Sequence, residues 1–293
     1  MSFLILFTFF FVSLFASETD TFSVRQNTFI DVTKELNVEI QRRLNIALER
    51  ANQSEGCDAD VLYEEVGKVL KRPFIGVVES WVNHSTLPSH KVNYEHSIYR
   101  DSSFYESPGL HLTEASLGLS IMLNGEIIGT DKLGHFFDQG YALYESYLKY
   151  GTLNKGMKYS DSTEQGIYGL TMTGIESFAD KVANHQGLIF WGNLIDRGYA
   201  YQKIATFRCK NNIFVWKHKF NWADYVDGAW DESINCNRYT GDMEKKVLKR
   251  INELGMSCPV GPQKCADAVK KYGDLKDHLL HPTCIKAGEK LLN

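Results

Sequence analysis

The chain has 293 residues and a slight excess of acidic side chains, which gives a formal net charge of −4. This balance argues against a nucleic-acid-binding protein, because such proteins usually present a strongly basic face. A chain of this length can bury one large hydrophobic core or two smaller ones.

The first sixteen residues are typical of a secretory signal peptide. An apolar run covers residues 3–15 and is followed by the small residue Ala16, although no lysine or arginine precedes it. The run is shorter than the roughly 20 apolar residues that a membrane span needs. We therefore expect an exported protein, periplasmic or secreted, without an integral membrane span.

The cysteines also favour export, because an even number in an exported chain usually forms disulfides. Fifteen pairings are possible, and the spacings match no zinc motif. We expect disulfides among the six cysteines, which are Cys57, Cys209, Cys236, Cys258, Cys265 and Cys284.

Hydrophobic periodicity predicts a mainly α (α+β) fold, with helices expected at residues 27–53, 58–71, 110–123, 129–150, 173–187, 243–254 and 264–272. A strand is expected at residues 74–82. A β-hairpin is expected at residues 157–171.

The predicted helix 129–150 carries a polar stripe on an otherwise apolar surface. The stripe consists of Asp131, His135, Asp138, Glu145 and Lys149 at helical spacing. Because unpaired buried charge is costly, we expect the stripe to line a cleft. The alternative is a half-covered helix with its polar edge in water.

Glu145 is the candidate general acid. Its neighbours Tyr144, Tyr147 and Leu148 are largely apolar, and it lies near a helix C-terminus. Both features would raise the pKa of its carboxyl group, as the general acid of a glycosidase requires. The alternative is a solvated glutamate or an ion pair with Lys149.

A second catalytic group is expected in or after the hairpin. Glu164 is the preferred carboxylate, with Asp161 and Glu176 as alternatives, although Glu176 also fits a capping box that starts at Thr173. Hydroxyl groups could instead hold the attacking water, and the candidates are Tyr168, Thr171 and Thr173.

The stripe also offers a different chemistry. Asp131 and His135 place two metal-ligand types on one helix face, and Asp180 with His185 could complete a metal site. A structural network of Asp131, His135 and Asp180 is equally consistent with the pattern.

Residues 212–237 interleave aromatic and acidic side chains, a composition that suits carbohydrate. Trp222 could stack on a sugar, while Asp224 and Asp227 could bind its hydroxyl groups or a cationic amino sugar. The alternative is a hydrophobic core segment with solvated acids.

Several of these segments resemble the lysozyme superfamily. The resemblance rests on Glu145-Ser146, the following QGIYGLT at 165–171 and the helix after it. GTDKLGHFF and TGIESFADKVANHQGLIFW are similar to a divergent branch that includes an exported lysozyme of predatory bacteria specific for deacetylated peptidoglycan. The resemblance covers about residues 110–191 and implies that Glu145 is catalytic. QGIYGLT departs from the usual hairpin motif, which leaves the water-positioning group open.

We therefore expect a signal peptide at 1–16, a lysozyme-like catalytic domain at 17–240 and a disulfide-rich helical appendage at 241–293. The expected function is cleavage of peptidoglycan glycan strands without a cofactor, by Glu145 and Glu164. The expected substrate-binding residues are Asp131, His135, Ser146, Tyr168, Thr171, Thr173, Asp180, Trp222, Asp224 and Asp227. The alternatives are a non-catalytic envelope protein and a metal-dependent hydrolase using Asp131, His135 and Asp180.

Overall fold

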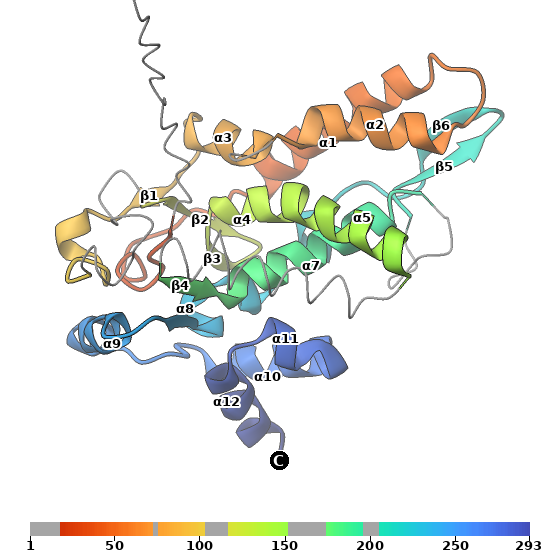
Figure 1. Cartoon of the computed structure of the whole chain (residues 1–293). Coiled ribbons are helices and arrows are strands. Elements are labelled where there is room, and N and C mark those ends of the chain that lie inside the picture. The colour runs from red at the N-terminus through yellow and green to blue at the C-terminus, as the bar shows by residue number, and fades with distance from the viewer. Residues whose placement is uncertain (1–17, 73–75, 103–116, 152–173, 196–204) are drawn as a thin grey trace, which may run out of the picture.

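The computed structural model describes residues 18–72, 76–102, 117–151, 174–195 and 205–293, and shows a mainly α-helical protein with small antiparallel sheets (Figure 1). The predicted fold class is confirmed at this level. The described α-helices are α1 (Thr33–Ala51), α2 (Ala59–Leu70), α3 (Val77–Asn83), α4 (Asp131–Gly134), α5 (Gly140–Tyr150), α7 (Phe178–Gly192), α8 (Glu232–Asn235), α9 (Met243–Glu253), α10 (Pro262–Tyr272), α11 (Lys276–Leu279) and α12 (Pro282–Leu292).

The described strands are short and pair antiparallel. They are β1 (His90–Lys91), β2 (Leu119–Leu123), β3 (Glu126–Gly129), β4 (Ile175–Ser177), β5 (Phe207–Lys210), β6 (Ile213–Trp216) and β7 (Asn237–Tyr239). They form the sheets β1-β2-β3, β4-β7 and β5-β6. The hairpin expected at 157–171 lies outside the described residues.

Two predictions of local structure are wrong. The strand expected at 74–82 is helical in its described part, where α3 packs its apolar residues Val78 and Val82 into the core. The helix expected at 110–123 is strand β2 over residues 119–123. The physical reason is the Asn124-Gly125 pair, whose φ angles of 54° and 75° form the turn of the β2–β3 hairpin instead of ending a helix.

The predicted helix 129–150 exists, but it is not regular. It consists of α4, a π-helical segment η3 (His135–Gln139) and α5. Such a segment corresponds to one inserted residue, which rotates the following helix by about 100° relative to a continuous α-helix. The residues of α5 therefore do not continue the helix face that carries Asp131 and His135.

Helix α7 begins at a different residue from the one predicted. Its N-cap is Ser177, whose hydroxyl accepts a hydrogen bond from the Asp180 backbone N–H at 3.2 Å. Glu176 lies in β4, so the alternative in which it belongs to a capping box is wrong. Every residue of α7 is buried, because this helix crosses the centre of the protein.

Helices α5 and α7 approach each other closely at a pair of glycines. A Cβ atom added at Gly187 would lie 1.9 Å from the backbone oxygen of Phe136, and one added at Gly140 would lie 2.5 Å from the Cα of Gly187. The two glycines therefore allow the backbone of α7 to contact the backbone of α5 and of the adjoining segment η3.

Aromatic side chains fill the space between these helices and the segment 220–230. Phe136 contacts rings from both regions, with Trp222 at 5.0 Å and Tyr225 at 5.1 Å between ring centroids. Trp222 and Trp230 are completely buried. The aromatic part of this segment is thus hydrophobic core, as the alternative interpretation of the sequence proposed.

One disulfide joins parts of the chain that are 152 residues apart, two others close short loops of 22 and 19 residues, and the prediction that all six cysteines are paired is confirmed. The bonds are Cys57–Cys209, Cys236–Cys258 and Cys265–Cys284.

Helices α9 to α12 form the C-terminal segment, where α9 and α10 confirm the two predicted helices. Within the described ranges, we find no helix with the length and apolarity that crossing a membrane requires.

The glycine contact gives a test of the packing. We expect Gly187→Ala to lower the free energy of unfolding by about 3 kcal/mol, since the added methyl group would overlap backbone that cannot move independently. The control is Gly192→Ala in the same helix, where the Tyr144 ring at 4.0 Å is the nearest described group that a Cβ would meet. We expect that change to cost less than about 1 kcal/mol. Equal effects in urea denaturation would contradict the account.

Candidate metal centre

The centre is built around a lysine that is completely removed from solvent. Lys132 lies in α4 and has an exposed fraction of 0%. Its Nζ lies 2.6 Å from Asp131 Oδ2, 2.6 Å from Asp180 Oδ1 and 2.5 Å from Glu232 Oε1. Burial alone would lower the pKa of Lys132, but the three carboxylates hold it well above its ordinary value. One ammonium group therefore joins α4, α7 and α8.

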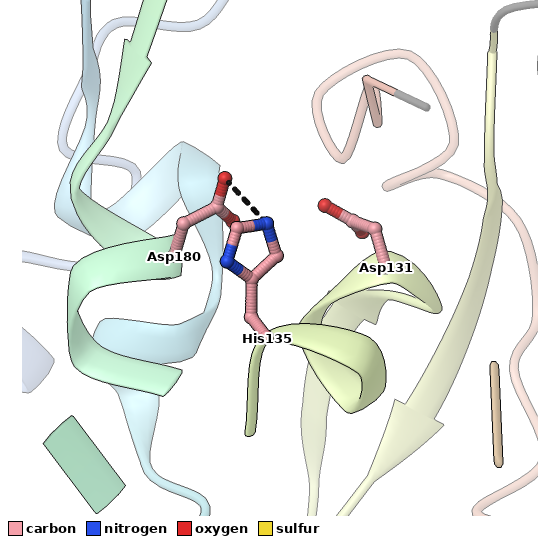
Figure 2. A group of neighbouring side chains, drawn as sticks. All are labelled: Asp131, His135 and Asp180. Carbon is pink, nitrogen blue, oxygen red and sulfur yellow. Dashed lines mark ion pairs between the residues drawn. The ribbon is translucent and has the colours of Figure 1, made fainter. Parts of the chain in front are cut away.

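His135 lies one helical turn after Asp131 and faces the same carboxylates. Its Nε2 lies 3.3 Å from Asp180 Oδ2. One potential ligand atom from each of Asp131, His135 and Asp180 lies within 4.8 Å of the other two. Figure 2 shows the two carboxylate groups on either side of the imidazole ring. The structure thus brings together three residues that the sequence suggested as ligands.

Neighbouring groups hold both carboxylates in place. Asp131 Oδ1 accepts a hydrogen bond from the Thr19 hydroxyl at 3.1 Å, while its Oδ2 is bound by Lys132. Asp180 lies in the first turn of α7, where a helix favours negative charge. Burial would raise the pKa of Asp180, but the charges of His135 and Lys132 hold it below its ordinary value. Asp180 is therefore kept ionised.

The other ring nitrogen of His135 faces an amide side chain. Its Nδ1 lies 3.0 Å from the Asn184 side chain on α7. The orientation that satisfies the amide donates its NH₂ group to Nδ1 at 3.0 Å and to the backbone oxygens of Asp180 and His135, both at 3.3 Å. Nε2 then carries the ring proton and faces Asp180 Oδ2, and a metal ion bound there would displace this proton.

Two further carboxyl groups lie within electrostatic reach of His135. Burial, together with the charge of Asp131, raises the pKa of Glu79 to about 7. Burial also raises the pKa of Asp138 to about 6, although this carboxylate accepts a hydrogen bond from the Arg72 backbone N–H at 2.8 Å. Groups with pKa values near neutrality can exchange protons under physiological conditions.

His185, the fourth ligand suggested by the sequence, is not part of the cluster. It lies five residues after Asp180 and therefore on another face of α7. Its ring is buried, and neither ring nitrogen has a hydrogen-bond partner among the described residues. Burial lowers the pKa of His185 to about 4, so its imidazole is neutral.

Glu145 lies apart from this centre, on α5 and exposed to solvent. The prediction that apolar neighbours enclose it is wrong, because the segment η3 turns this part of the helix to a different side. Burial raises the pKa of the Tyr141 hydroxyl to about 12, and the nearby Glu145 carboxylate adds to this shift. Tyr141 also lines a pocket of about 500 Å³ between α2 and α5. Ser146, the neighbour of Glu145, is half-buried on the same helix.

The predicted sugar-binding residues of the aromatic segment lie in different environments. Trp222 packs in the core, where its ring is not available to a ligand. Asp224 is exposed and lies 3.1 Å from the His218 ring. Asp227 accepts bonds from Lys271 and the Tyr272 hydroxyl, both at 2.6 Å, and thereby connects its loop to α10. Of these three residues, only Asp224 is exposed to a ligand and does not hold its loop to another element. Glu164, Tyr168, Thr171 and Thr173 lie outside the described residues.

Sequence reasoning placed Lys132 in the half of the helix that holds the site together, but it did not identify the partners of this lysine and it missed Glu79 and Glu232. Glu79 was assigned to a strand, and Glu232 was one acid among several in a segment without periodicity. Their proximity depends on contacts between α3, α4 and α8 that local patterns do not contain.

Comparison of the chain with protein-family models, curated proteins and solved structures finds no match. The resemblance to the lysozyme superfamily therefore stays a prediction from the sequence. Part of the segment that carries it, residues 110–116 and 152–173, lies outside the described residues.

Glu79 gives a prediction about pH. Its pKa is about 7 in the folded protein and has an ordinary value of 4.5. Its protonation therefore stabilises the fold fully below about pH 4.5, and this contribution of about 3 kcal/mol is lost as pH rises through 7. We expect Glu79→Gln to gain stability relative to wild type between pH 5 and pH 8, measured by urea denaturation in EDTA. The exposed Glu95→Gln serves as control. A pH-independent difference for Glu79→Gln would contradict the assignment.

Proposed function

We propose that Asp131, His135 and Asp180 bind a divalent transition metal and that the protein is an exported metal-dependent hydrolase. The observation that carries this proposal is the convergence of their ligand atoms within 4.8 Å, from helices far apart in the sequence (Figure 2). One imidazole nitrogen with two carboxylate oxygens is a donor set that suits zinc and neighbouring divalent metals.

The surrounding charges support a cation at this position. Asp131, Asp180 and Glu232, when ionised, outnumber the Lys132 ammonium by two charges, and by one charge when His135 is protonated. Burial raises the pKa of Glu232 to about 7, which reflects the cost of a further negative charge here. A divalent cation would balance the excess. Lys132 and Thr19 would then act as outer-shell groups that orient the ligating carboxylates.

The arrangement is suited to hydrolysis. With Asp131, His135 and Asp180 as its ligands, a metal such as zinc would keep a coordination position open and would activate water there. Glu79, with its pKa near 7, could accept or return a proton in this environment. Asp131 and Asp180 are about nine-tenths buried, and the His135 side chain keeps 20% exposure through which a substrate group can approach.

The first test is metal binding. We expect the metal-free mature protein to bind one zinc ion per chain by calorimetry, and His135→Ala or Asp180→Asn to weaken binding by more than about 100-fold, since even outer-shell changes cost 10–100-fold. His218→Ala is the matched control, because His218 and Asp224 form an exposed pair to which no other described residue adds a third ligand. Absence of zinc binding by wild type, or equal loss in the control, would contradict the proposal.

A second candidate function is cleavage of peptidoglycan glycan strands by Glu145. The observation that favours it is the position of this carboxylate, which is exposed and lies near Tyr141, a residue that lines the α2–α5 pocket. An exposed carboxylate beside a pocket can be reached by a polymer. Export would bring the protein to peptidoglycan, and the three disulfides fit a protein that is exported to an oxidising environment.

The two functions respond differently to chelation. If Glu145 is the general acid, we expect Glu145→Gln to lower release of soluble fragments from purified peptidoglycan by at least about 100-fold. EDTA should then have no effect, and the exposed Glu49→Gln should behave as wild type. Unchanged release by Glu145→Gln would exclude this candidate. Release that EDTA abolishes would favour the metal centre.

A further inference from the structure

The pocket between α2 and α5 contains an amine that is held against aromatic rings. Lys71 directly follows α2, and its side chain folds back over Gly67, where an added Cβ would lie 2.9 Å from its Cε. This path places Nζ 2.9 Å from the ring centroid of Tyr141 and 5.6 Å from that of Trp191. The absence of a side chain at Gly67 therefore allows the amine to reach the aromatic side chain of α5.

Two lysines line this pocket, and their environments differ. Lys68 is exposed and forms ion pairs of 2.7 and 2.6 Å with two glutamates of α2, which raise its pKa. Lys71 is half-buried, and no ion pair joins it to a carboxylate among the described residues. Burial lowers the pKa of Lys71, although the charges of Glu145 and Asp138 oppose this shift. Lys71 therefore loses its proton more readily than Lys68, and a neutral lysine is a nucleophile.

The side chains around this amine offer contact to an uncharged ligand. Tyr63, Tyr141, Tyr144 and Leu148 all line the pocket. Tyr63 and Tyr144 stack at 5.4 Å between ring centroids, and the Tyr144 hydroxyl donates a hydrogen bond to the Tyr63 hydroxyl at 2.9 Å. These contacts hold the rings in place, so that the wall is formed before a ligand enters. An apolar or aromatic group can pack against it.

We propose that Lys71 is a covalent binding site for small aldehydes that carry an apolar or aromatic group. The pocket volume of about 500 Å³ is within the range of sites that hold small molecules. A carbonyl compound suits this place because it needs a nucleophile and brings no charge into a half-buried, aromatic environment. This inference goes beyond the proposed metal centre and beyond catalysis by Glu145. It needs neither, so its failure would leave both standing.

The reaction is the formation of an imine. The neutral Nζ of Lys71 attacks the carbonyl carbon, a C–N bond forms, and the carbonyl oxygen takes up a proton released from the nitrogen. The resulting carbinolamine loses its hydroxyl group together with the remaining nitrogen-bound hydrogen as water, and a C=N bond forms. One amine and one aldehyde thus give one imine and one water, and the reaction needs no oxidant or reductant.

The test traps the imine in the mature wild-type protein, with millimolar benzaldehyde as the probe and sodium cyanoborohydride as the trapping reductant. Peptide mapping by mass spectrometry at low conversion gives the labelling rate of each lysine. We expect Lys71 to react at least about tenfold faster than Lys68 and than the exposed Lys91 outside the pocket, because only Lys71 combines a desolvated amine with an aromatic wall. Unfolding in urea should remove this preference.

Two comparisons distinguish binding in the pocket from general reactivity. Gly67→Ala should lower the labelling of Lys71 to about the rate of Lys91, since the added methyl group would displace the Lys71 side chain. The variant should fold, because alanine favours a helix and its Cβ would meet only the flexible end of that lysine among the described residues. Formaldehyde, which has no apolar group, should show less preference for Lys71 than benzaldehyde does.

The labelling of wild-type protein keeps the proposal testable if Gly67→Ala does not fold. Any of four results would overturn the proposal: equal labelling of Lys71 and Lys91, a preference that persists in urea, an equal preference with formaldehyde, or undiminished labelling in folded Gly67→Ala. Preferential labelling of Lys71 by benzaldehyde that both urea and Gly67→Ala abolish would support it.

Discussion

The organisation of the protein's centre depends on one buried ammonium group. Transferring a lysine out of water costs several kcal/mol, and this cost is offset only when close partners satisfy the charge. Lys132 has three carboxylate partners, from α4, α7 and α8, and these elements must meet for the fold to form. The same ion pairs that hold the helices together also position two carboxylates beside His135.

Backbone contacts determine where His135 lies. The glycines at 140 and 187 let α5 and α7 touch, and the π-helical segment begins at His135 immediately before that contact. Because π-helical turns in α-helices occur frequently at functional sites, an irregular turn at this position agrees with a functional role for His135. The close packing and the irregular turn together fix the imidazole between Asp131 and Asp180 (Figure 2).

Much of the local structure could be predicted from the sequence. Apolar periodicity indicated α1, α2, α9 and α10, and the even number of cysteines indicated disulfides. The polar stripe also identified Asp131 and His135 correctly as neighbours. Its extension to Glu145 was wrong, because periodicity assumes a regular helix and does not reveal the inserted residue of η3.

Other features could not be read from local patterns. The segment at 74–82 is rich in residues that favour strands, yet its described part forms helix α3 because tertiary packing outweighs such propensities. The partners of Lys132 include Glu232, which is one hundred residues away in the chain. Only the assembled fold shows that Lys132 and its three carboxylate partners are buried together.

We propose that Asp131, held by Thr19 and Lys132, and Asp180, held by Lys132, bind a metal ion together with His135. Anomalous diffraction at the zinc edge, from crystals of the mature protein grown with zinc, tests it most directly. The account predicts one strong peak about 2.0–2.2 Å from His135 Nε2 and from a carboxylate oxygen of each aspartate, with Lys132 still bound to both carboxylates. A map without a peak between these three side chains would contradict it.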